Sequence, residues 1–544
     1  MIKDDSKRIH LEIQQHRKNP IGLFRTTYYD HRKIKHETIG RVKGVGLQEL
    51  KLIQATLQGK VVLKDEFKII GSKEHGATYT LLEIAKQTGL DRMIYSRPSK
   101  QWVRDALAMI VGRAVYAGSK LALTRAVDDS TLWEQAGAGN CEIDVNKHCY
   151  DAMDSLLSRK EAIQKALAKQ HLNDNFVVLY DITSSYLEGE YEDSEIVDFG
   201  YNRDKKKGKK QIVIGLICSR QGCPVAVEVF RGNTGDSSTV IEKIRDLKNK
   251  YGVEEAIFVG DRGMLKQCKL DEIASDESLV IRTITAITRA GLGKLCEHRS
   301  VQMSVFDKDH VVEVTLPEEP GIRYGLCFNP IQAARSRKTR TELIEKTTEI
   351  LAKIAVPKRK TADGKLGIRV GRILDKYKTG KYFITEIKDG KLSFSVNEDA
   401  VEEAQAYDGL YAVRTDVKPE HMTIEEAVGH YKSLAKVEQA FRSLKSPQLE
   451  IRPVYHKTDE RIDSHVFICM LSYYLIWQMK NRLKPLFDED GVGRSKKYTL
   501  VSVIERLKSI RQEKVNFQGI INYSITKPDD EQQKILDLLG VSLL

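Results

Sequence analysis

The sequence predicts an α/β protein in which helices pack against a mixed β-sheet. Two short apolar runs, at 176–180 and 256–260, are typical of strands that are buried on both faces. An aspartate follows each run directly, Asp181 after the first and Asp261 after the second. The residues between them read as two further strands and one helix, so strands and a helix alternate along this stretch.

The order of these elements narrows the prediction. Segments 212–218 and 225–230 are joined by the short turn R-Q-G-C-P and read as a hairpin. A helix with Asp236 or Ser237 at its N-cap follows and ends near Gly252. The order β, β, β, α, β is that of a ribonuclease H-like core with a five-stranded mixed sheet. Such a sheet places the ends of its first and fourth strands side by side, which would bring Asp181 and Asp261 together.

A third acid is predicted on a later helix, residues 431–445, which Pro447 ends. Apolar residues recur along it at intervals of three and four, namely Leu434, Val437, Phe441 and Leu444. Tyr431, Glu438 and Lys445 are spaced by seven, so on one continuous helix they lie in a line beside the apolar stripe. Glu438 is therefore the candidate for the third carboxylate.

Composition and pattern divide the chain into six predicted regions. They are a basic β segment for DNA-end binding (1–70), a helical DNA-binding or linker region (71–175), the first part of the core (176–264), a largely β insertion domain (265–425), the second part of the core (426–485) and a C-terminal helical region that either serves dimerisation or caps the core (486–544). Within the helical region, T-L-L-E-I-A-K-Q-T-G-L fits either a plain helical pair or part of a helix-turn-helix.

The totals suit a folded protein with a polyanionic partner. The 544 residues exceed what one hydrophobic core covers, and 88 Lys and Arg against 76 Asp and Glu give a formal charge of +12. The charged N-terminus lacks a signal-peptide pattern, and the longest apolar run, 466–477, is shorter than the roughly 20 residues that span a bilayer. We expect a cytoplasmic, nucleoid-associated protein with no membrane partner and reduced cysteines.

Three converging carboxylates predict a metal site. They repel one another unless a cation neutralises them, and ligands that are all oxygen suit Mg²⁺, with Mn²⁺ as a substitute. Two such ions can activate an attacking water or 3′-hydroxyl and stabilise the leaving oxygen of a phosphodiester. The sequence contains no P-loop motif for a nucleotide-driven reaction.

Cations near these acids are candidates for DNA contact. Arg203, Lys209 and Lys210 lie in the segment R-D-K-K-K-G-K-K-Q, which leads into the second strand. This segment is either a solvated loop or a phosphate contact. Arg262 follows Asp261 and would contact phosphate or pair with a neighbouring acid.

Taken together, the motifs resemble the DDE transposases of bacterial insertion sequences, in the group with a β-rich insertion before the catalytic glutamate. The resemblance covers about 79–479. It rests on Y-D-I-T-S-S-Y-L-E-G-E (180–190), G-Y-N-R-D (200–204), Q-I-V-I-G-L (211–216), E-V-F-R-G-N-T-G-D (228–236), V-G-D-R-G-M-L (259–265) and the helix at 431–445.

The resemblance implies specific roles. Asp181, Asp261 and Glu438 would bind two Mg²⁺ ions and catalyse cleavage at the terminal inverted repeats of the element and joining to target DNA. The protein would act as a dimer or higher multimer on paired ends. The family's helix motif, Y-x2-R-x3-E-x6-K, is matched at Tyr431, Glu438 and Lys445, whereas Leu434 replaces its arginine. Arg442, about 40° from Glu438 around the helix, is a candidate substitute for phosphate contact.

Two other functions remain compatible with these residues. A stand-alone ribonuclease H-like nuclease would cut DNA without specific ends. A DNA-binding regulator derived from a transposase would bind without cutting, although the retention of all three acids argues against it.

Overall fold

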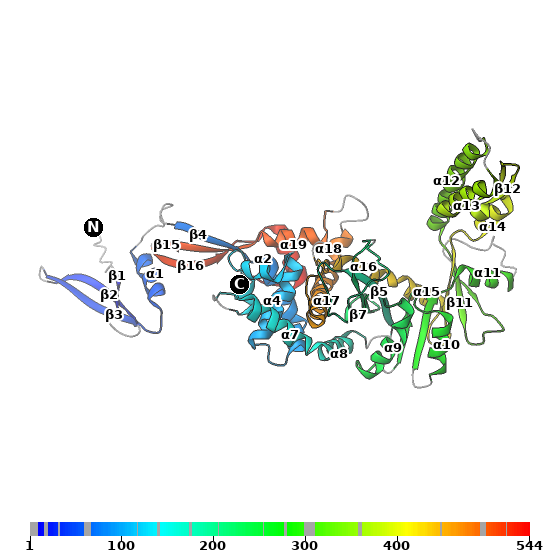
Figure 1. Cartoon of the computed structure of the whole chain (residues 1–544). Helices are drawn as coiled ribbons and strands as arrows, with labels where there is room; N and C mark the ends of the chain where they lie inside the picture. The colour runs from blue at the N-terminus through cyan, green and yellow to red at the C-terminus, as the bar shows by residue number, and fades with distance from the viewer. Residues whose placement is uncertain are drawn as a thin grey trace. The chain divides into compact units, whose positions relative to one another are not determined.

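The computed structural model (Figure 1) describes residues 9–15, 20–30, 33–58, 67–116, 118–138, 142–172, 177–204, 206–253, 255–276, 280–298, 311–356, 362–446, 449–489, 497–517 and 519–543. Contacts divide the chain into two compact units. Unit 1 comprises Met1–Ile163, Glu188–Ser194 and Ser443–Leu544, and unit 2 comprises Gln164–Leu187 and Glu195–Arg442. Asp181, Asp261 and Glu438 all lie in unit 2.

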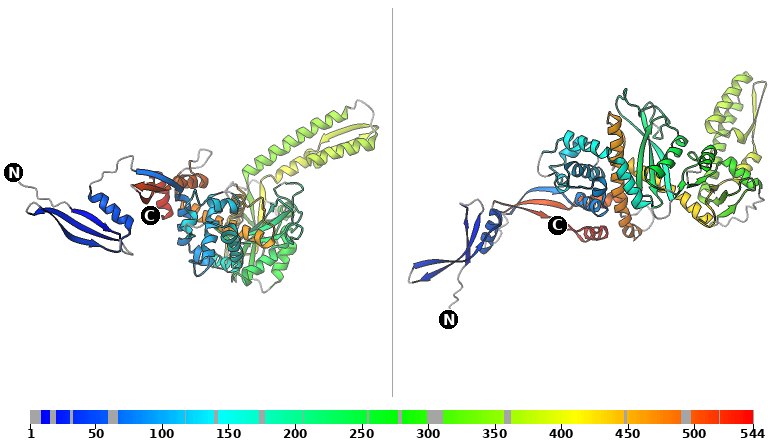
Figure 2. Two further views of the ribbon diagram at one scale, coloured as in Figure 1. Left: turned by 60° about the vertical axis from the view of Figure 1, so that its left-hand side comes forward. Right: turned by 90° about the horizontal axis from the view of Figure 1, so that it is seen from below.

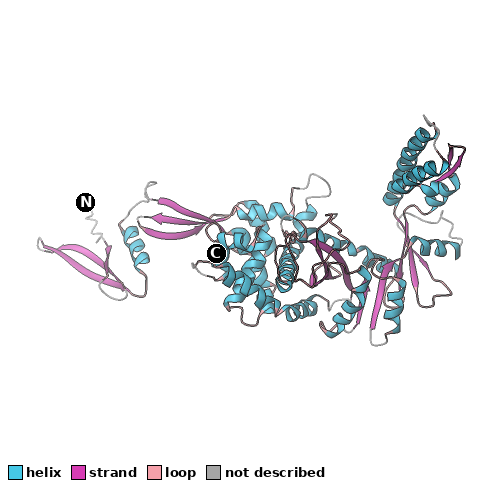
Figure 3. Ribbon diagram, in the orientation of Figure 1, coloured by secondary structure: helices cyan, strands magenta, loops and turns pink. Residues whose placement is uncertain are grey.

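Unit 2 is built on one eight-stranded sheet, whose strands are magenta in Figure 3. Its strand order is β10-β11-β14-β9-β8-β5-β6-β7. The strands are β5 (Val177–Tyr186), β6 (Gln211–Ser219), β7 (Pro224–Arg231), β8 (Glu255–Val259), β9 (Val280–Ala286), β10 (Val312–Val314), β11 (Arg323–Phe328) and β14 (Leu410–Thr415). Every described residue of β6 is buried, which explains its uninterrupted apolar sequence.

The predicted mixed sheet is confirmed, but the predicted boundary of the insertion is wrong. β7-β6-β5-β8-β9 is the ribonuclease H-like order, with β6 antiparallel to β5 and β7, and β8 parallel to β5 and β9. β9 therefore belongs to the core, although the predicted insertion began at 265. β14, β11 and β10 then extend the same sheet by antiparallel pairing. The sheet has eight strands because a strand edge left open by the core is paired by strands from the insertion.

Helices of unit 2 pack on this sheet and beside it. They are the later part of α8 (Lys160–His171), α9 (Val240–Asn249), α10 (Gln267–Ser275), α11 (Arg289–His298), α15 (Ile424–Lys432) and α16 (Leu434–Leu444), which is in unit 2 up to Arg442. α15 contacts β9, β11 and β14. The amide of Gln164 on α8 bonds both the Val227 backbone N–H (2.6 Å) and the Tyr251 hydroxyl (3.2 Å), which fixes α8 to β7.

The segment between β11 and β14 forms a substructure of its own, which we call the arm. It contains α12 (Pro330–Ala355), α13 (Asp363–Tyr377), β12 (Phe383–Lys388), β13 (Lys391–Val396) and α14 (Glu398–Ala406). α12 and α13 lie side by side (Figure 2), and a separate hydrophobic core joins them to β12 and β13. The predicted largely β insertion is wrong, because helices make up most of the regular structure described between 265 and 425.

Unit 1 opens with a small antiparallel sheet, β1 (Ile9–Gln14), β2 (Ile21–Asp30) and β3 (Lys33–Val42), followed by α1 (Leu47–Leu57). The predicted hairpin in this region is confirmed by the pairing of β2 with β3. Leu11, Leu23 and Leu50 are buried here.

The helices of unit 1 surround one buried helix, α17 (Asp459–Arg482), which contacts α2, α4 and α7. The others are α2 (Gly76–Gln87), α3 (Leu90–Ile94), α4 (Gln101–Val115), α5 (Lys120–Arg125), α6 (Leu132–Ala136), α7 (Asp151–Leu157), α18 (Lys484–Glu489), α19 (Leu500–Lys508) and α20 (Asp530–Leu539). Among the residues that the structure describes, no helix combines the length and apolar character needed to cross a membrane.

The region 486–544 is not purely helical, contrary to the prediction. β15 (Arg511–Phe517) and β16 (Ile520–Ile525) form a hairpin there, and β15 also pairs with β4 (Phe67–Glu74). This pairing joins residues more than 400 positions apart, so no local pattern indicates it.

Candidate active site

Asp181 and Asp261 occupy matching positions on two parallel neighbouring strands. β5 and β8 pair with Leu179 opposite Val259, and each aspartate follows two residues later. Asp261 lies beyond the end of β8, as predicted. Asp181 does not end its strand, because β5 continues to Tyr186 through antiparallel pairing with β6. Phe176, the first residue of the predicted strand, lies outside the described residues. The register explains how both carboxylates come to the same edge.

Burial makes Asp181 a weak acid. The pKa of Asp181 is raised to about 6, mainly by burial and in smaller part by the negative charges of Asp261 and Glu438. The backbone N–H of Ile182, which donates to Oδ1 of Asp181 at 2.8 Å, and the charge of Arg203 act in the opposite direction. Because both other acids act on Asp181, the three predicted carboxylates share one electrostatic environment.

Glu438 lies on α16, which is fixed to the sheet near its N-terminal end. Nζ of Lys436 donates to the carbonyl oxygen of Arg220, in the turn between β6 and β7, at 2.8 Å. Val437 and Phe441 are buried on the opposite side, as the apolar stripe predicted. The Glu438 side chain is 63% exposed, and Nη2 of Arg442 lies 3.8 Å from its Oε2.

The predicted single helix over 431–445 is wrong. α15 ends at Lys432 and α16 begins at Leu434, because Ser433 forms a turn between them. The Ser433 hydroxyl donates back to the Gly429 carbonyl (3.1 Å), and its own carbonyl accepts from the N–H of Lys436. Tyr431 and Glu438 are thus on different helices. The half-buried Lys445 follows the end of α16 and belongs to unit 1.

Tyr431 interacts with Asp261, although the sequence predicted a position in line with Glu438. Its hydroxyl donates a hydrogen bond to the carboxylate of Asp261. Burial raises the pKa of Tyr431 to about 12, and the charge of Asp261 adds to the rise. The phenol therefore stays protonated at neutral pH and orients Asp261. Leu434, at the position of the family's arginine, is half-buried.

The donor set fits a divalent cation. Carboxylate oxygens are the ligands that Mg²⁺ and Mn²⁺ prefer. Burial is the main cause of the raised pKa of Asp181, and the charges of Asp261 and Glu438, which contribute to it, are ones that a cation would neutralise. Within the described part of the chain, no three His, Cys, Asp or Glu side chains converge closely enough to hold a metal ion as they stand. Glu438 is turned towards Arg442, so its side chain would have to rotate to join the aspartates.

The predicted DNA-binding cations have different surroundings. Arg203 is turned into the protein, where Nη1 donates to the Ile182 carbonyl (2.7 Å) and Nη2 to Oδ2 of Asp236 (2.6 Å). Arg203 thus supports the strand that carries Asp181. Lys209 is exposed and Lys210 is half-buried, in the loop before β6. Arg262 is exposed, and its backbone N–H donates to Oδ1 of Asp261 (2.8 Å).

A cleft of about 560 Å³ opens beside Asp261 within unit 2. Its polar lining includes Arg262, Arg289, Asn329, Gln332, Ser336, Tyr407, Tyr411 and Tyr431. Three of these, Asn329, Gln332 and Ser336, come from the start of α12 and its N-cap. Sequence reasoning missed this cleft, because its residues are scattered over 170 positions and only the fold brings them together.

Two glycines in the recognised motifs have a structural role that sequence reasoning missed. A Cβ atom on Gly200 would lie 2.0 Å from the carbonyl oxygen of Gly232, and one on Gly232 would lie 2.1 Å from that of Gln211. The side-chain amide of Gln211 donates to the Gly232 carbonyl at 2.7 Å. Only glycine permits this approach of three backbone segments. The motifs therefore hold the loop that carries Arg203 against the end of β7.

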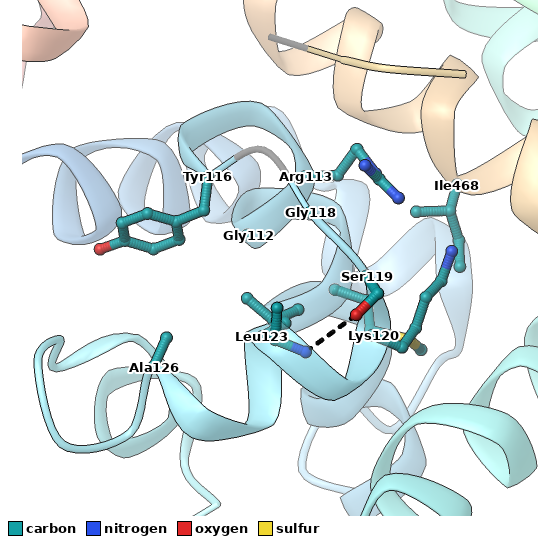
Figure 4. Close-up of a pocket in the computed structure, with 11 residues that line it drawn as sticks. Gly112, Arg113, Tyr116, Gly118, Ser119, Lys120, Leu123, Ala126 and Ile468 are labelled. Atoms are coloured by element: carbon teal, nitrogen blue, oxygen red, sulfur yellow. Dashed lines mark hydrogen bonds between the residues drawn. The ribbon is translucent and has the colours of Figure 1, made fainter. Parts of the chain in front are cut away.

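A second concentration of titratable groups lies in unit 1. Lys120 is 7% exposed, and its Nζ lies 2.7 Å from Nδ1 of His465. Figure 4 shows Lys120 and Arg113 beside a small pocket of about 120 Å³, with Ile468 of α17 next to Lys120. The pKa of Lys120 is lowered to about 7, mainly by burial and in smaller part by the charge of Arg113.

The fold and the paired aspartates define a ribonuclease H-like catalytic domain, and comparison identifies its family. The family described as Transposase DDE domain matches residues 177–475, which is more than half of the chain. The protein belongs to this family of DDE transposases. No curated protein matches it.

Among solved structures, the chain is similar to a cryo-EM structure of the piggyBac transposase synaptic complex with hairpin DNA. The TM-score is 0.32 at 7% identity, over 79% of this chain and 75% of that chain. A TM-score this low establishes neither a shared fold nor a shared function.

Proposed function

We propose that the protein is the DNA transposase of a bacterial insertion sequence. It binds the terminal inverted repeats of its own element, cleaves at the element ends and joins them to target DNA. The observation that carries the proposal is the coincidence of the family match over 177–475 with three electrostatically coupled acids, Asp181, Asp261 and Glu438. Those acids occur where a ribonuclease H-like domain carries out phosphodiester chemistry.

The three acids would hold two Mg²⁺ ions, or Mn²⁺ as a substitute. When bound, such ions supply activation of a water or 3′-hydroxyl and stabilisation of the leaving oxygen. The protein's own residues prepare this site. Tyr431 holds Asp261 in one orientation, and Arg203 holds the backbone at Ile182, next to Asp181. Burial keeps Asp181 partly protonated in the absence of a cation, and that proton leaves when a cation binds.

Arg442 and Arg262 are the proposed phosphate contacts at the scissile position. Arg442 now lies 3.8 Å from Glu438 in an exposed ion pair. When DNA and cations bind, Glu438 would turn to the metal and Arg442 to a phosphate. Lys445, Lys209 and Lys210 would contact DNA further from the reacting phosphate. The N-terminal sheet and the helical region bind the element ends, and the protein acts as a dimer or higher multimer in the bacterial nucleoid.

The test is cleavage of a supercoiled plasmid that carries the two element ends, with Mg²⁺, by wild-type protein and by Asp261→Asn. Wild-type protein should nick at the ends and transfer them, and the variant should bind the ends without cutting. Asp271→Asn, on exposed α10, is the matched control and should cut normally. Cleavage retained by Asp261→Asn would overturn the assignment. Cutting that ignores the ends would indicate a stand-alone nuclease, and binding without cutting by wild-type protein would indicate a regulator.

A further inference from the structure

The arm carries a surface that the proposed catalytic site does not use. Residues 330–396 contain 17 Lys and Arg but 7 Asp and Glu, so this segment holds much of the chain's positive charge. On α13 the cations are ordered. Lys365, Arg369, Arg372 and Lys376 are separated by four, three and four residues, which puts them on one face of the helix. We call this face the α13 basic stripe.

The stripe is exposed and points away from the core of the arm. A different face of α13, about 110° round the helix, is buried through Leu366 and Val370, which pack with Leu351 of α12 and Phe383 of β12. All four cations are exposed, and in the described structure none of them forms an ion pair with an acid. Lys376 lies over the ring of Tyr377, 5.3 Å from its centroid. Four like charges on one helix face repel one another, so the arm's own folding does not explain them.

The neighbouring helix, α12, carries acids among its exposed cations. On α12, Glu342, Glu345 and Glu349 are interspersed with the exposed cations Lys338 and Lys346, and Lys338 lies 3.9 Å from Glu342. This mixture is what an ordinary solvated helix shows. The α13 basic stripe is therefore a local feature of one face and not a property of the whole arm.

The partner that fits the stripe is the sugar-phosphate backbone of a DNA duplex. Successive cations are about one helical turn apart, roughly 5.4 Å, and a DNA strand carries a charge about every 3.4 Å along its axis, so each cation of the stripe has a phosphate within reach of its long side chain. Beside the stripe, Gly364 and Gly371 leave the helix surface low, and a Cβ at either position would meet nothing within 4 Å. Each glycine destabilises an exposed helix by about 1 kcal/mol. Packing inside the arm does not require these glycines, whereas close approach of a DNA backbone to the helix would.

The base of the arm adjoins the cleft beside Asp261. Asn329, Gln332 and Ser336 line that cleft, and α12 rises from it. The end of α13 meets α12 where Thr347 and Thr379 bond through their hydroxyls (3.2 Å). Eleven residues separate Ser336 from Thr347, which at about 1.5 Å per residue is roughly 17 Å. The ion pair of Arg340 with Asp408, both nearly buried, ties α12 to the segment that leads into β14.

We infer that the α13 basic stripe binds the backbone of the duplex that flanks the scissile phosphate, starting roughly five base pairs from it and continuing for about five more. This inference rests on the proposed function for the identity of the scissile phosphate. The binding surface itself rests only on the arm. The stripe reads no sequence, since all its contacts are with phosphates.

The test measures duplex affinity of the full-length protein in EDTA, by fluorescence anisotropy with a 40-base-pair element end, over a series of KCl concentrations. Arg369→Gln/Arg372→Gln should lower the slope of log affinity against log salt by about 2, since each lost phosphate contact removes about 0.9. Lys338→Gln/Lys353→Gln, at two exposed positions of α12, makes the same change in charge and should leave the slope nearly unchanged. Glutamine preserves helix propensity, and circular dichroism checks the fold.

Three outcomes would overturn the inference. The first is an unchanged slope in the α13 variant, and the second is an equal fall of the slope in both variants. The third is a hydroxyl-radical footprint on the element end that is as long for the α13 variant as for wild-type protein between about five and ten base pairs from the scissile phosphate. The experiment needs no cleavage. If wild-type protein fails to cut element ends but the slope of the α13 variant still falls by about 2, the proposed function fails and the inference about the arm stands.

Discussion

The burial of Asp181 predicts that a less acidic side chain there stabilises the protein when no cation is present. The folded protein holds the Asp181 proton up to a pKa of about 6, whereas the usual value is 3.8. The folded state therefore binds this proton more strongly than the unfolded chain does. The free energy of unfolding falls as pH rises from about 4 to about 6, and it stays low above that range. Asp181→Asn carries no charge and should not show this fall.

The size of the effect follows from the same values. A rise from 3.8 to about 6, at about 1.4 kcal/mol per pH unit, corresponds to about 3 kcal/mol at pH 7.5. At pH 4 both proteins carry a neutral side chain, and the difference should nearly vanish. Magnesium should reverse the order at pH 7.5, because it binds the folded wild-type site and binds the variant less well.

Hydrogen exchange in peptides from β5 and β6, monitored by mass spectrometry, measures the local free energy of unfolding around Asp181. It avoids the complication that the two compact units unfold separately. In EDTA at pH 7.5, exchange in Asp181→Asn should be on the order of a hundredfold slower than in wild-type protein. The control Asp271→Asn should exchange like wild-type protein. Equal exchange of wild-type protein and Asp181→Asn at pH 7.5, or a difference that persists at pH 4, would refute the reasoning.

Three further predictions follow from single contacts. Tyr431→Phe removes the hydrogen bond to Asp261, which is worth about 1.5–3 kcal/mol for a charged acceptor. The cleavage rate should therefore fall about tenfold or more while end binding is unchanged. An unaltered single-turnover rate would show that Tyr431 does not position the acid. Lys120, whose pKa burial lowers to about 7 from 10.5, binds its proton more strongly in the unfolded chain, so the free energy of unfolding should rise between pH 7 and 10. Lys120→Met should abolish that rise and raise the melting temperature at pH 7, and calorimetry at both pH values decides the matter. Arg340→Met leaves Asp408 buried without its partner and should destabilise the base of the arm by about 3–5 kcal/mol, seen as faster exchange in α12 peptides; Arg340→Met combined with Asp408→Leu should recover most of the loss.

The sequence predicted the core well where local patterns carry the information. Continuous apolar runs followed by acids located β5 and β8, and an amphipathic stripe located α16 and Glu438. It did not predict that β5 continues beyond Asp181, because S-S-Y lacks an apolar signal and its strand conformation depends on pairing with β6. The break at Ser433 was equally hidden, since a serine in a helical pattern gives no sign of whether its hydroxyl bonds back to the chain.

Longer-range features were harder to predict for a physical reason. Whether β9, β11 and β14 form a separate domain or extend the core sheet depends on which strand edge is open, and a strand's own sequence says little about that. The contact of Tyr431 with Asp261, in place of a position beside Glu438, likewise depends on the direction in which α15 meets the sheet. The helical nature of the arm, in contrast, is visible in part, since the charged stretch 331–354 contains no Gly or Pro.

The way in which the arm joins β11 and β14 means that the arm could be deleted or replaced without disturbing the sheet. Phe328 at the end of β11 and Leu410 at the start of β14 are direct antiparallel partners, and the N–H of Asn329 donates to the Gly409 carbonyl at 2.8 Å. Excision of residues 330–408 would therefore leave Phe328-Asn329-Gly409-Leu410, and Asn-Gly is the pair most favoured in a two-residue hairpin turn. Arg340 and Asp408 would leave together, so no buried charge would be stranded. At this junction one arm can therefore be removed or replaced by another while β11 and β14 remain in register.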